Sequence, residues 1–423
     1  MEYARESLWE LVQGGKDTTQ TLNLCSHTTR EQTDLAILPS KLPWYTWWLR
    51  QQTERIPPSI SEKVVHIVGF DKTFSETAKR AQSDQTVSID DIVRHLITQN
   101  IIQIDRNDGG WEAAQNLVFG IIGWQTMLYA PSFGTCPPQH LAICDDLDGF
   151  TGQAYMTLKQ DRVHATSCLP DFLLGFGLML PKENAYLGED LEEKKDFDSV
   201  STIHSGELNI YLLRSIGRVN IKWVDVLAPH MEYDIATNTV FLFRYPSFCA
   251  ASLTCTGDID PTGVIHCCAT HCPTDDNWAS KDEVSQFLRE VLLSYRLLFG
   301  QSKMSRNMFR TLHPFCNVKR EGHDHLLARL CGRKRVEDDF THIVERDSYR
   351  LNRDFPILRS KIVVLHRQLS NMKPRGLRQL WRDTRDSVQW FTFWAVLVIG
   401  GLGVVLSVIQ VGLQAAQLAG VNQ

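Results

Sequence analysis

The sequence predicts an α+β fold: a mixed cytosolic body, then a helical C-terminal region and one transmembrane helix. Three observations lead to this prediction. Short apolar runs separated by turn residues fill the chain up to about residue 280, which is typical of strands mixed with helices. Apolar residues then recur at helical spacing. Finally, the uncharged apolar stretch at residues 391–409 is long enough to cross a bilayer.

Length and composition are those of an ordinary folded protein. The chain has 423 residues, of which 43% are hydrophobic and 22% charged, with a formal net charge of −5. This acidic balance argues against nucleic acid as a partner, because phosphate binding needs a concentrated Lys/Arg surface. A chain of this length suits two domains, or one large domain with an appendage. We expect an aromatic-rich segment at 1–60, the α+β body at 61–279, a helical region at 280–386, the transmembrane helix at 387–412 and a short polar tail at 413–423.

The sequence of the N-terminal half predicts an aromatic cluster, a strand, a helix and a buried element, in that order along the chain. Residues 43–48 hold an aromatic cluster, PWYTWW, which either packs onto its own domain, as we favour, or docks on a membrane surface or a partner. Residues 64–68 predict a strand, and residues 88–100 a helix with one apolar face. The apolar run at 118–130 is too short to cross a bilayer and predicts a buried element.

Further along the chain lies a charge-rich segment at 182–198, for which we expect a surface loop. Three strands should then follow one another, at 219–226, 230–234 and 239–245. Ser280 with Glu283 predicts the capping box of a helix that carries an apolar stripe. Two further helices are expected, at 355–369 and 374–386.

The apolar stretch predicts insertion into a bilayer. At about 1.5 Å per residue, residues 391–409 span roughly 28 Å, close to the ~30 Å hydrocarbon core. Its Leu, Ile, Val and Phe side chains together favour insertion by several kcal/mol, and no central charge opposes them. A buried core helix is the alternative, but such helices rarely lack a polar face over this length.

The flanks of this stretch predict its orientation. Basic residues precede it and none follows; they are Lys373, Arg375, Arg378, Arg382 and Arg385. By the positive-inside rule the body faces the cytosol. The first thirty residues hold no apolar run long enough for a signal peptide, because acidic residues between Glu2 and Asp17 interrupt them. This pattern, and eleven cysteines expected as buried thiols, agree with a cytosolic body. We expect a single-pass, tail-anchored protein of the endoplasmic reticulum or another endomembrane.

Small residues inside the stretch predict a contact between helices. Gly400, Gly403 and Ser407 would let two copies approach closely, so self-association is a further expectation. The other expected partners are the lipid bilayer and an unidentified protein.

The strongest chemical pattern is a group of cysteine and histidine residues. Its members are Cys255, His266, Cys268, His271 and Cys272. Thiolate and imidazole are the ligands that zinc prefers, and Cys268 and His271 have a workable chelate spacing. Because a second C-x-x-C half is missing, buried thiols near a loop are the alternative. Zinc is the only cofactor that these residues predict.

A second pattern lies at residues 141–150, where a short strand precedes Asp146 and Asp148. It is similar to the nucleophile loop of haloacid-dehalogenase-type phosphohydrolases, in which one Asp attacks phosphorus. That chemistry also needs Mg²⁺ and downstream Lys and acidic residues at spacings that this chain lacks. A solvated acidic turn is the interpretation we favour.

Several stretches carry a family resemblance. The most specific is LRQLWRDTRDSVQWFTFWAVLVIGGLGVVLSVIQ at 377–410, and others lie at 221–234, 290–301, 326–332 and 353–369. Together they resemble a group of uncharacterised filamentous-fungal (ascomycete) membrane proteins with a single C-terminal transmembrane helix. The resemblance implies a fungal origin and a membrane anchor, and it brings no catalytic residues.

From these observations we expect a membrane-tethered, non-enzymatic interaction or accessory protein that faces the cytosol. One alternative is a zinc-binding module or metal-dependent enzyme centred on residues 266–272. Another, which the resemblance implies, is an accessory protein of a fungal specialised-metabolite pathway.

Overall fold

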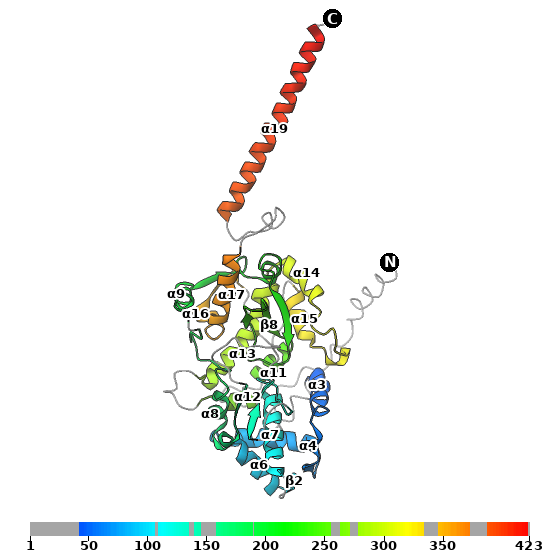
Figure 1. The fold of residues 1–423 in the computed structure, drawn as a ribbon, viewed down its shortest axis with the longest axis vertical. Helices are drawn as coiled ribbons and strands as arrows, with labels where there is room; N and C mark the ends of the chain where they lie inside the picture. The colour runs from blue at the N-terminus through cyan, green and yellow to red at the C-terminus, as the bar shows by residue number, and fades with distance from the viewer. Residues whose placement is uncertain are drawn as a thin grey trace, which may run out of the picture. The chain divides into compact units, whose positions relative to one another are not determined.

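A computed structural model describes residues 42–105, 109–134, 139–144, 158–188, 190–254, 263–270, 278–333, 346–372 and 387–421. Within these ranges the body is a mixture of helices and short strands, as predicted (Figure 1). The described strands form four small sheets, three of two strands and one of three. Because the sheets are small, packed helices supply most of the core.

The N-terminal part of the body is a layer of helices around a two-stranded sheet. Its elements are α3 (Pro43–Thr53), α4 (Pro58–Ser61), β1 (Val64–His66), α5 (Phe70–Ser83), α6 (Ile89–Thr98), β2 (Ile102–Ile104) and α7 (Gly110–Thr126). The predicted strand at 64–68 is confirmed as β1, which pairs antiparallel with β2. The helix predicted at 88–100 is confirmed as α6, and Ser88 and Asp91 form its capping box. The buried element predicted at 118–130 is the second half of α7 and the segment after it.

The aromatic cluster at 43–48 belongs to α3 and packs onto the body itself. Trp44 stacks on Tyr245 with the ring centroids 4.0 Å apart, and its indole N–H donates to Ser247 Oγ at 2.7 Å. The hydroxyl of Tyr45 donates to the carbonyl oxygen of Trp124 at 2.8 Å. These contacts between distant parts of the chain fix α3 against the centre of the body.

The middle of the body contains its largest described sheet. The elements are β3 (His140–Ala142), β4 (Lys159–Asp161), η1 (Arg162–Thr166), α8 (Leu169–Leu174), α9 (Leu191–Ser199), β5 (Thr202–His204), α10 (Ile210–Ser215), β6 (Asn220–Val224), β7 (Tyr233–Asp234) and β8 (Thr239–Phe243). The three strands predicted at 219–245 are confirmed as β6, β7 and β8, in the sheet order β6-β8-β7. β8 pairs parallel with β6 and antiparallel with β7.

The surface loop predicted at 182–198 is wrong in its second half, which forms α9. The Asp190 side chain caps this helix by accepting from the N–H of Glu192 at 2.8 Å. Phe197 is buried, and Arg367 of α17 pairs with the acidic side of the helix, reaching Asp196 at 3.1 Å. The charges that suggested a loop therefore bind α9 to another helix.

The C-terminal part of the body is helical, as predicted. Its elements are α11 (Pro246–Thr254), α12 (Val264–Cys267), α13 (Lys281–Tyr295), the π-helix η2 (Arg296–Gly300), α14 (Lys303–Leu312), η3 (Arg320–Gly322), α15 (His325–Gly332), β9 (Ser348–Arg350), α16 (Leu351–Asp354) and α17 (Arg359–Asn371). The capping box predicted at Ser280 is confirmed. The helix predicted from residue 355 begins only at Arg359, because Glu290 of α13 accepts the backbone N–H groups of Ile357 and Leu358 and holds a turn there. The helix predicted at 374–386 lies outside the described residues.

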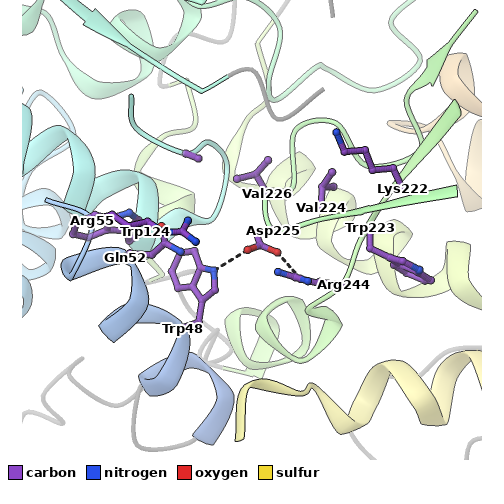
Figure 2. Close-up of a pocket in the computed structure, with 11 residues that line it drawn as sticks. Trp48, Gln52, Arg55, Trp124, Lys222, Trp223, Val224, Asp225, Val226 and Arg244 are labelled. Carbon is purple, nitrogen blue, oxygen red and sulfur yellow. Dashed lines mark hydrogen bonds and ion pairs between the residues drawn. The ribbon is translucent and has the colours of Figure 1, made fainter. Parts of the chain in front are cut away.

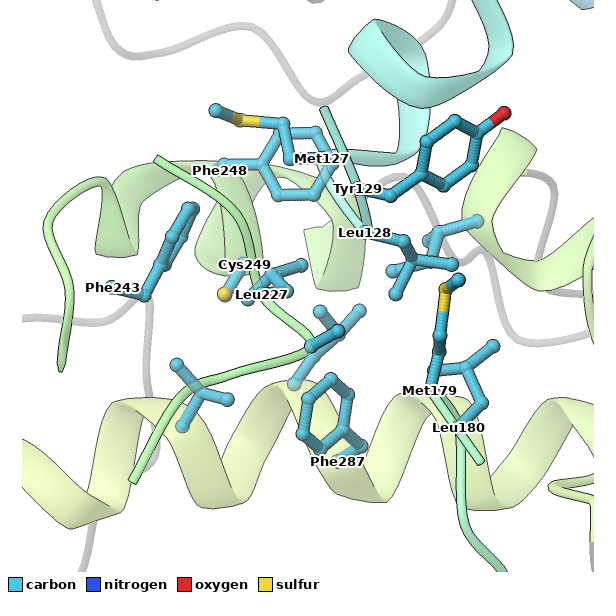
Figure 3. Packing of buried hydrophobic residues seen from close by; sticks show 14 of the residues in the cluster. Met127, Leu128, Tyr129, Met179, Leu180, Leu227, Phe243, Phe248, Cys249 and Phe287 are labelled. Carbon is cyan, nitrogen blue, oxygen red and sulfur yellow. The ribbon is translucent and has the colours of Figure 1, made fainter. Parts of the chain in front are cut away.

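One hydrophobic cluster joins these parts. It runs from Leu42 of the α3 segment to Leu369 of α17, across the expected boundary at residue 279. Figure 3 shows part of it, where Phe287 of α13 lies in the same cluster as Leu227 and Met179 from earlier segments. The thiol of Cys249 is buried there as well, as expected of a small apolar side chain in a core.

The C-terminal helix α19 (Ser387–Val421) contains the stretch predicted to cross a membrane. Within it, Phe391–Gln417 is long and apolar enough to span a bilayer, and none of this stretch is buried inside the protein. The helix extends past the predicted span because residues 413–419, LQAAQLA, favour helix.

Candidate functional site

The predicted zinc ligands are only partly described by the structure. Cys255, His271 and Cys272 lie outside the described residues. His266 and Cys268 lie in and just after α12, and both are fully buried. His266 Nε2 is 3.0 Å from Ser285 Oγ, and Cys268 Sγ is 3.6 Å from the carbonyl oxygen of Val264. The structure thus gives both side chains neighbours within the core.

Burial also changes the chemistry of Cys268. It raises the pKa of this thiol well above its usual value, which disfavours the thiolate that zinc binds. Among the described residues, no three His, Cys, Asp or Glu side chains are placed to hold a metal ion. The zinc site therefore stays a prediction that depends on Cys255, His271 and Cys272. Asp146 and Asp148 of the phosphohydrolase-like pattern also lie outside the described residues.

A buried pair of serine and histidine invites comparison with a catalytic dyad. His230 Nε2 lies 2.8 Å from Ser294 Oγ. However, His230 Nδ1 accepts the backbone N–H of Phe243 at 3.1 Å, so the ring proton is on Nε2 and is donated to the serine. A general base must accept the serine proton instead. Burial lowers the pKa of His230 to about 3. This pair is therefore a structural element of the core.

A cavity among the described residues lies where two parallel strands end. β6 and β8 finish side by side at Val224 and Phe243, and the next residues are Asp225 and Arg244. Ligands of α/β folds commonly bind beyond the carboxyl ends of parallel strands. Here a cavity of about 230 Å³ is lined by these two residues, by α3 and by the end of α7 (Figure 2). We name it the strand-end pocket.

Local backbone bonds position this pocket. After β6 the chain turns toward the segment that follows α7, and the N–H of Leu227 donates to the carbonyl oxygen of Met127 at 2.7 Å. The N–H of Arg244 donates to the carbonyl oxygen of Val224 at 3.0 Å, which continues the pairing of β6 and β8 for one more residue. These bonds place Asp225 and Arg244 next to each other although they are distant in sequence.

Asp225 and Arg244 form the polar centre of the pocket. Arg244 Nε lies 2.5 Å from Asp225 Oδ1, and the indole N–H of Trp48 donates to Asp225 Oδ2 at 3.2 Å (Figure 2). The Arg244 guanidinium also lies over the rings of Tyr245 and Phe315, 5.3 and 5.8 Å from their centroids. The two charged side chains are thereby held in a fixed arrangement.

The pocket is cationic and aromatic. Arg55, Lys222 and Arg244 line it, against the single carboxylate of Asp225. Burial alone would lower the pKa of Arg244, but Asp225 and Tyr245 together outweigh burial and raise this pKa, so the guanidinium is charged. Trp48 and Trp124 add apolar walls. Such a lining suits a small ligand with an anionic group and a flat apolar part.

Sequence reasoning did not find the strand-end pocket. The strands were expected, but nothing in their sequences signals that β6 pairs with β8 in parallel. Each strand is followed at once by a charged residue, in WVD at 223–225 and LFR at 242–244. These charges indicate an ion pair only once the register of β6 and β8 is known.

No protein-family model, no curated protein and no solved structure matches this chain. The resemblance to the fungal membrane proteins stays a prediction. A function has to be inferred from the helix α19 and from the pocket.

Proposed function

We propose that this protein is a membrane-anchored accessory protein that presents its α+β body to the cytosol. One observation carries the proposal: Phe391–Gln417 of α19 has no ionisable side chain and none of it is buried inside the protein. Left in water, this apolar surface would be strongly unfavourable, whereas in a bilayer it favours insertion by several kcal/mol.

The residues before α19 support the orientation. The five basic residues between Lys373 and Arg385 favour the cytosolic side of the membrane. The free thiols of the body agree with a reducing compartment, since Cys249, Cys268 and Cys331 are buried without disulfides. We further propose that the protein acts beside the enzymes of a fungal specialised-metabolite pathway. This part of the proposal is supported by the family resemblance alone.

Carbonate extraction of membranes that contain the full-length protein tests the anchor. We expect the wild-type protein in the pellet and the variant Leu402→Arg/Val405→Arg in the supernatant, because each central charge costs about 2.5–3.5 kcal/mol. Val163→Arg is the matched control, since Val163 is an exposed apolar residue of the body (73% exposed). It should remain in the pellet. Wild-type protein in the supernatant would contradict the proposal.

A second candidate function is binding of a small anion in the strand-end pocket. The observation that favours it is the excess of cations around the Asp225–Arg244 pair, in a pocket that three tryptophans line. An aromatic carboxylate would place its charge near Arg55 and Arg244 and its ring against Trp48.

Tryptophan fluorescence of the purified full-length protein tests this candidate, with benzoate and inorganic phosphate as probes. We expect benzoate to quench the emission saturably, and Arg55→Gln to weaken its binding about tenfold through loss of one charged contact. Arg50→Gln is the matched control, because Arg50 is an exposed residue of α3, the helix that precedes Arg55, and does not line the pocket. Equal benzoate titrations for the two variants would exclude the strand-end pocket as the binding site. Stronger binding of phosphate than of benzoate would indicate a phosphate-containing ligand instead of an aromatic carboxylate.

A further inference from the structure

Helix α14 is unusually basic for this chain. Its sequence, KMSRNMFRTL, holds three basic residues and no acidic one. It lies in the segment 302–335, which has nine Lys or Arg and two Asp or Glu. The whole chain, in contrast, has a formal net charge of −5. Positive charge is therefore concentrated here, in addition to the basic residues just before α19.

The side of α14 that faces the body is fixed by packing. Its Phe309 makes edge contacts with Phe299 of η2 and Trp223 of β6, with centroids 5.7 and 6.2 Å apart. Ser305 is buried, and its hydroxyl accepts the backbone N–H of Tyr211 at the start of α10. α14 is therefore a firmly held helix with one defined outer side.

The outer side of α14 is cationic with an apolar residue among the charges. Lys303, Met304, Asn307 and Arg310 are all exposed and recur at the three- and four-residue spacing of one helix face. Met304 is a large apolar side chain that is 43% exposed. The adjoining α10 adds Arg214 and no acidic residue. We name this side the α14 face.

Helix α14 lies at the end of the body from which the chain leaves for α19. Figure 1 shows α14 and the last turn of α17 at the same end of the body. Residues 372–386 connect α17 to α19. Even fully extended, this connection reaches at most about 50 Å, so this end of the body is held within that distance of the bilayer.

We propose that the α14 face binds the anionic lipid headgroups of the bilayer that α19 crosses, which rests on the membrane anchoring proposed above. Lys303 and Arg310 are complementary to the negative surface of the cytosolic leaflet, and Met304 is placed to enter the headgroup region. Because α19 keeps the body near the lipid, even a weak contact becomes populated. Arg306 is not part of the contact, since its guanidinium donates to the carbonyl oxygen of Gly300 within the body.

Amide hydrogen exchange of the full-length protein in vesicles tests this inference. One set of vesicles is phosphatidylcholine alone, and the other also contains phosphatidylserine. We expect slower exchange in α14 only with phosphatidylserine, and loss of that protection at high salt. Lys303→Gln/Arg310→Gln should reduce the bound population roughly 30-fold, since each cation near the surface contributes on the order of fivefold.

The control variant is Lys159→Gln/Arg289→Gln, which removes two exposed cations from β4 and α13 and should leave the α14 protection unchanged. Equal exchange of α14 in both vesicles, with the protein still resistant to carbonate extraction, would overturn the inference and leave the anchor intact. Protection that needs an added cytosolic protein fraction would also overturn it, in favour of a protein partner. Release of the wild-type protein by carbonate would instead refute the anchor itself.

Discussion

Glu290 shows how a single buried residue couples the body to pH. Its carboxylate accepts the N–H groups of Ile357 and Leu358, at 3.0 and 2.7 Å, and the side-chain amide of Gln286 at 3.0 Å. Burial nevertheless outweighs these hydrogen bonds and raises the pKa of Glu290 to about 8. The folded protein therefore prefers the protonated form of this residue more than the unfolded chain does.

The sign of the pH dependence follows from this pKa. A carboxyl whose pKa is raised on folding stabilises the protein fully below its unfolded pKa of about 4.3, and this stabilisation is lost as the pH rises through about 8. Glu290→Gln cannot ionise. We therefore expect the free energy of unfolding of the wild type to fall, relative to that of the variant, between about pH 5 and about pH 9. Urea unfolding of both proteins at these pH values measures the two free energies of unfolding. A difference between them that does not change with pH would contradict the prediction.

For individual residues, the sequence indicated which side chains could bind a metal but not what surrounds them in the fold. His266 and Cys268 have the chemistry of zinc ligands, yet the structure places both in the core, near Ser285 and Val264. Whether a cysteine is a ligand or a buried thiol depends on its neighbours in space, and spacing along the chain does not contain that information. The same is true of Asp225 and Arg244, which become neighbours only through the parallel pairing of β6 and β8.

Among the elements, the π-helix η2 depends on one glycine. A Cβ atom on Gly300 would meet the Arg296 guanidinium, with the Arg296 Cζ atom nearest. Arg296 is fully buried and donates to the carbonyl oxygens of Leu330 and Arg333, at the C-terminal end of α15. The close approach at Gly300 thus lets a cation bind the negative end of a neighbouring helix.

We expect Gly300→Ala to destabilise the protein by about 1–3 kcal/mol, because the methyl group must displace a well-packed side chain. Chemical unfolding of the variant and of Gly206→Ala measures the effect. Gly206 has nothing within 4 Å of its Cβ position, so the control should change stability by less than about 0.5 kcal/mol. Equal losses for both variants would contradict the role of the close approach.

Elements defined by local signals could be predicted from the sequence. Ser280 caps α13 as expected, and α6 lies where its apolar face predicted a helix, because a cap and an apolar stripe act over a few neighbouring residues. α9 was missed because its charges resemble a loop until Arg367, far along the chain, pairs with them. The start of α17 was misplaced for a similar reason, since Glu290 holds the preceding turn from another helix.

At the scale of the whole molecule, the core is continuous. It includes buried residues from α3 to α17, and α11 packs against α13 across the expected boundary at residue 279. We therefore expect the body of the full-length protein, in detergent, to unfold in one cooperative transition. Circular dichroism and tryptophan fluorescence should give coincident curves. Two separate transitions would instead support independent domains on either side of residue 279.

The length of α19 has a consequence for the kind of membrane that suits it. Phe391–Gln417 contains 27 residues, which as a helix extend about 40 Å. A hydrocarbon layer of about 27 Å, typical of the endoplasmic reticulum, accommodates this helix only with strong tilt, whereas one of about 32–33 Å requires less. If α19 crosses a bilayer, its hydrophobic mismatch is therefore smaller in the thicker of these two layers. Shortening the apolar stretch by one or two turns should reduce its mismatch with the thinner layer.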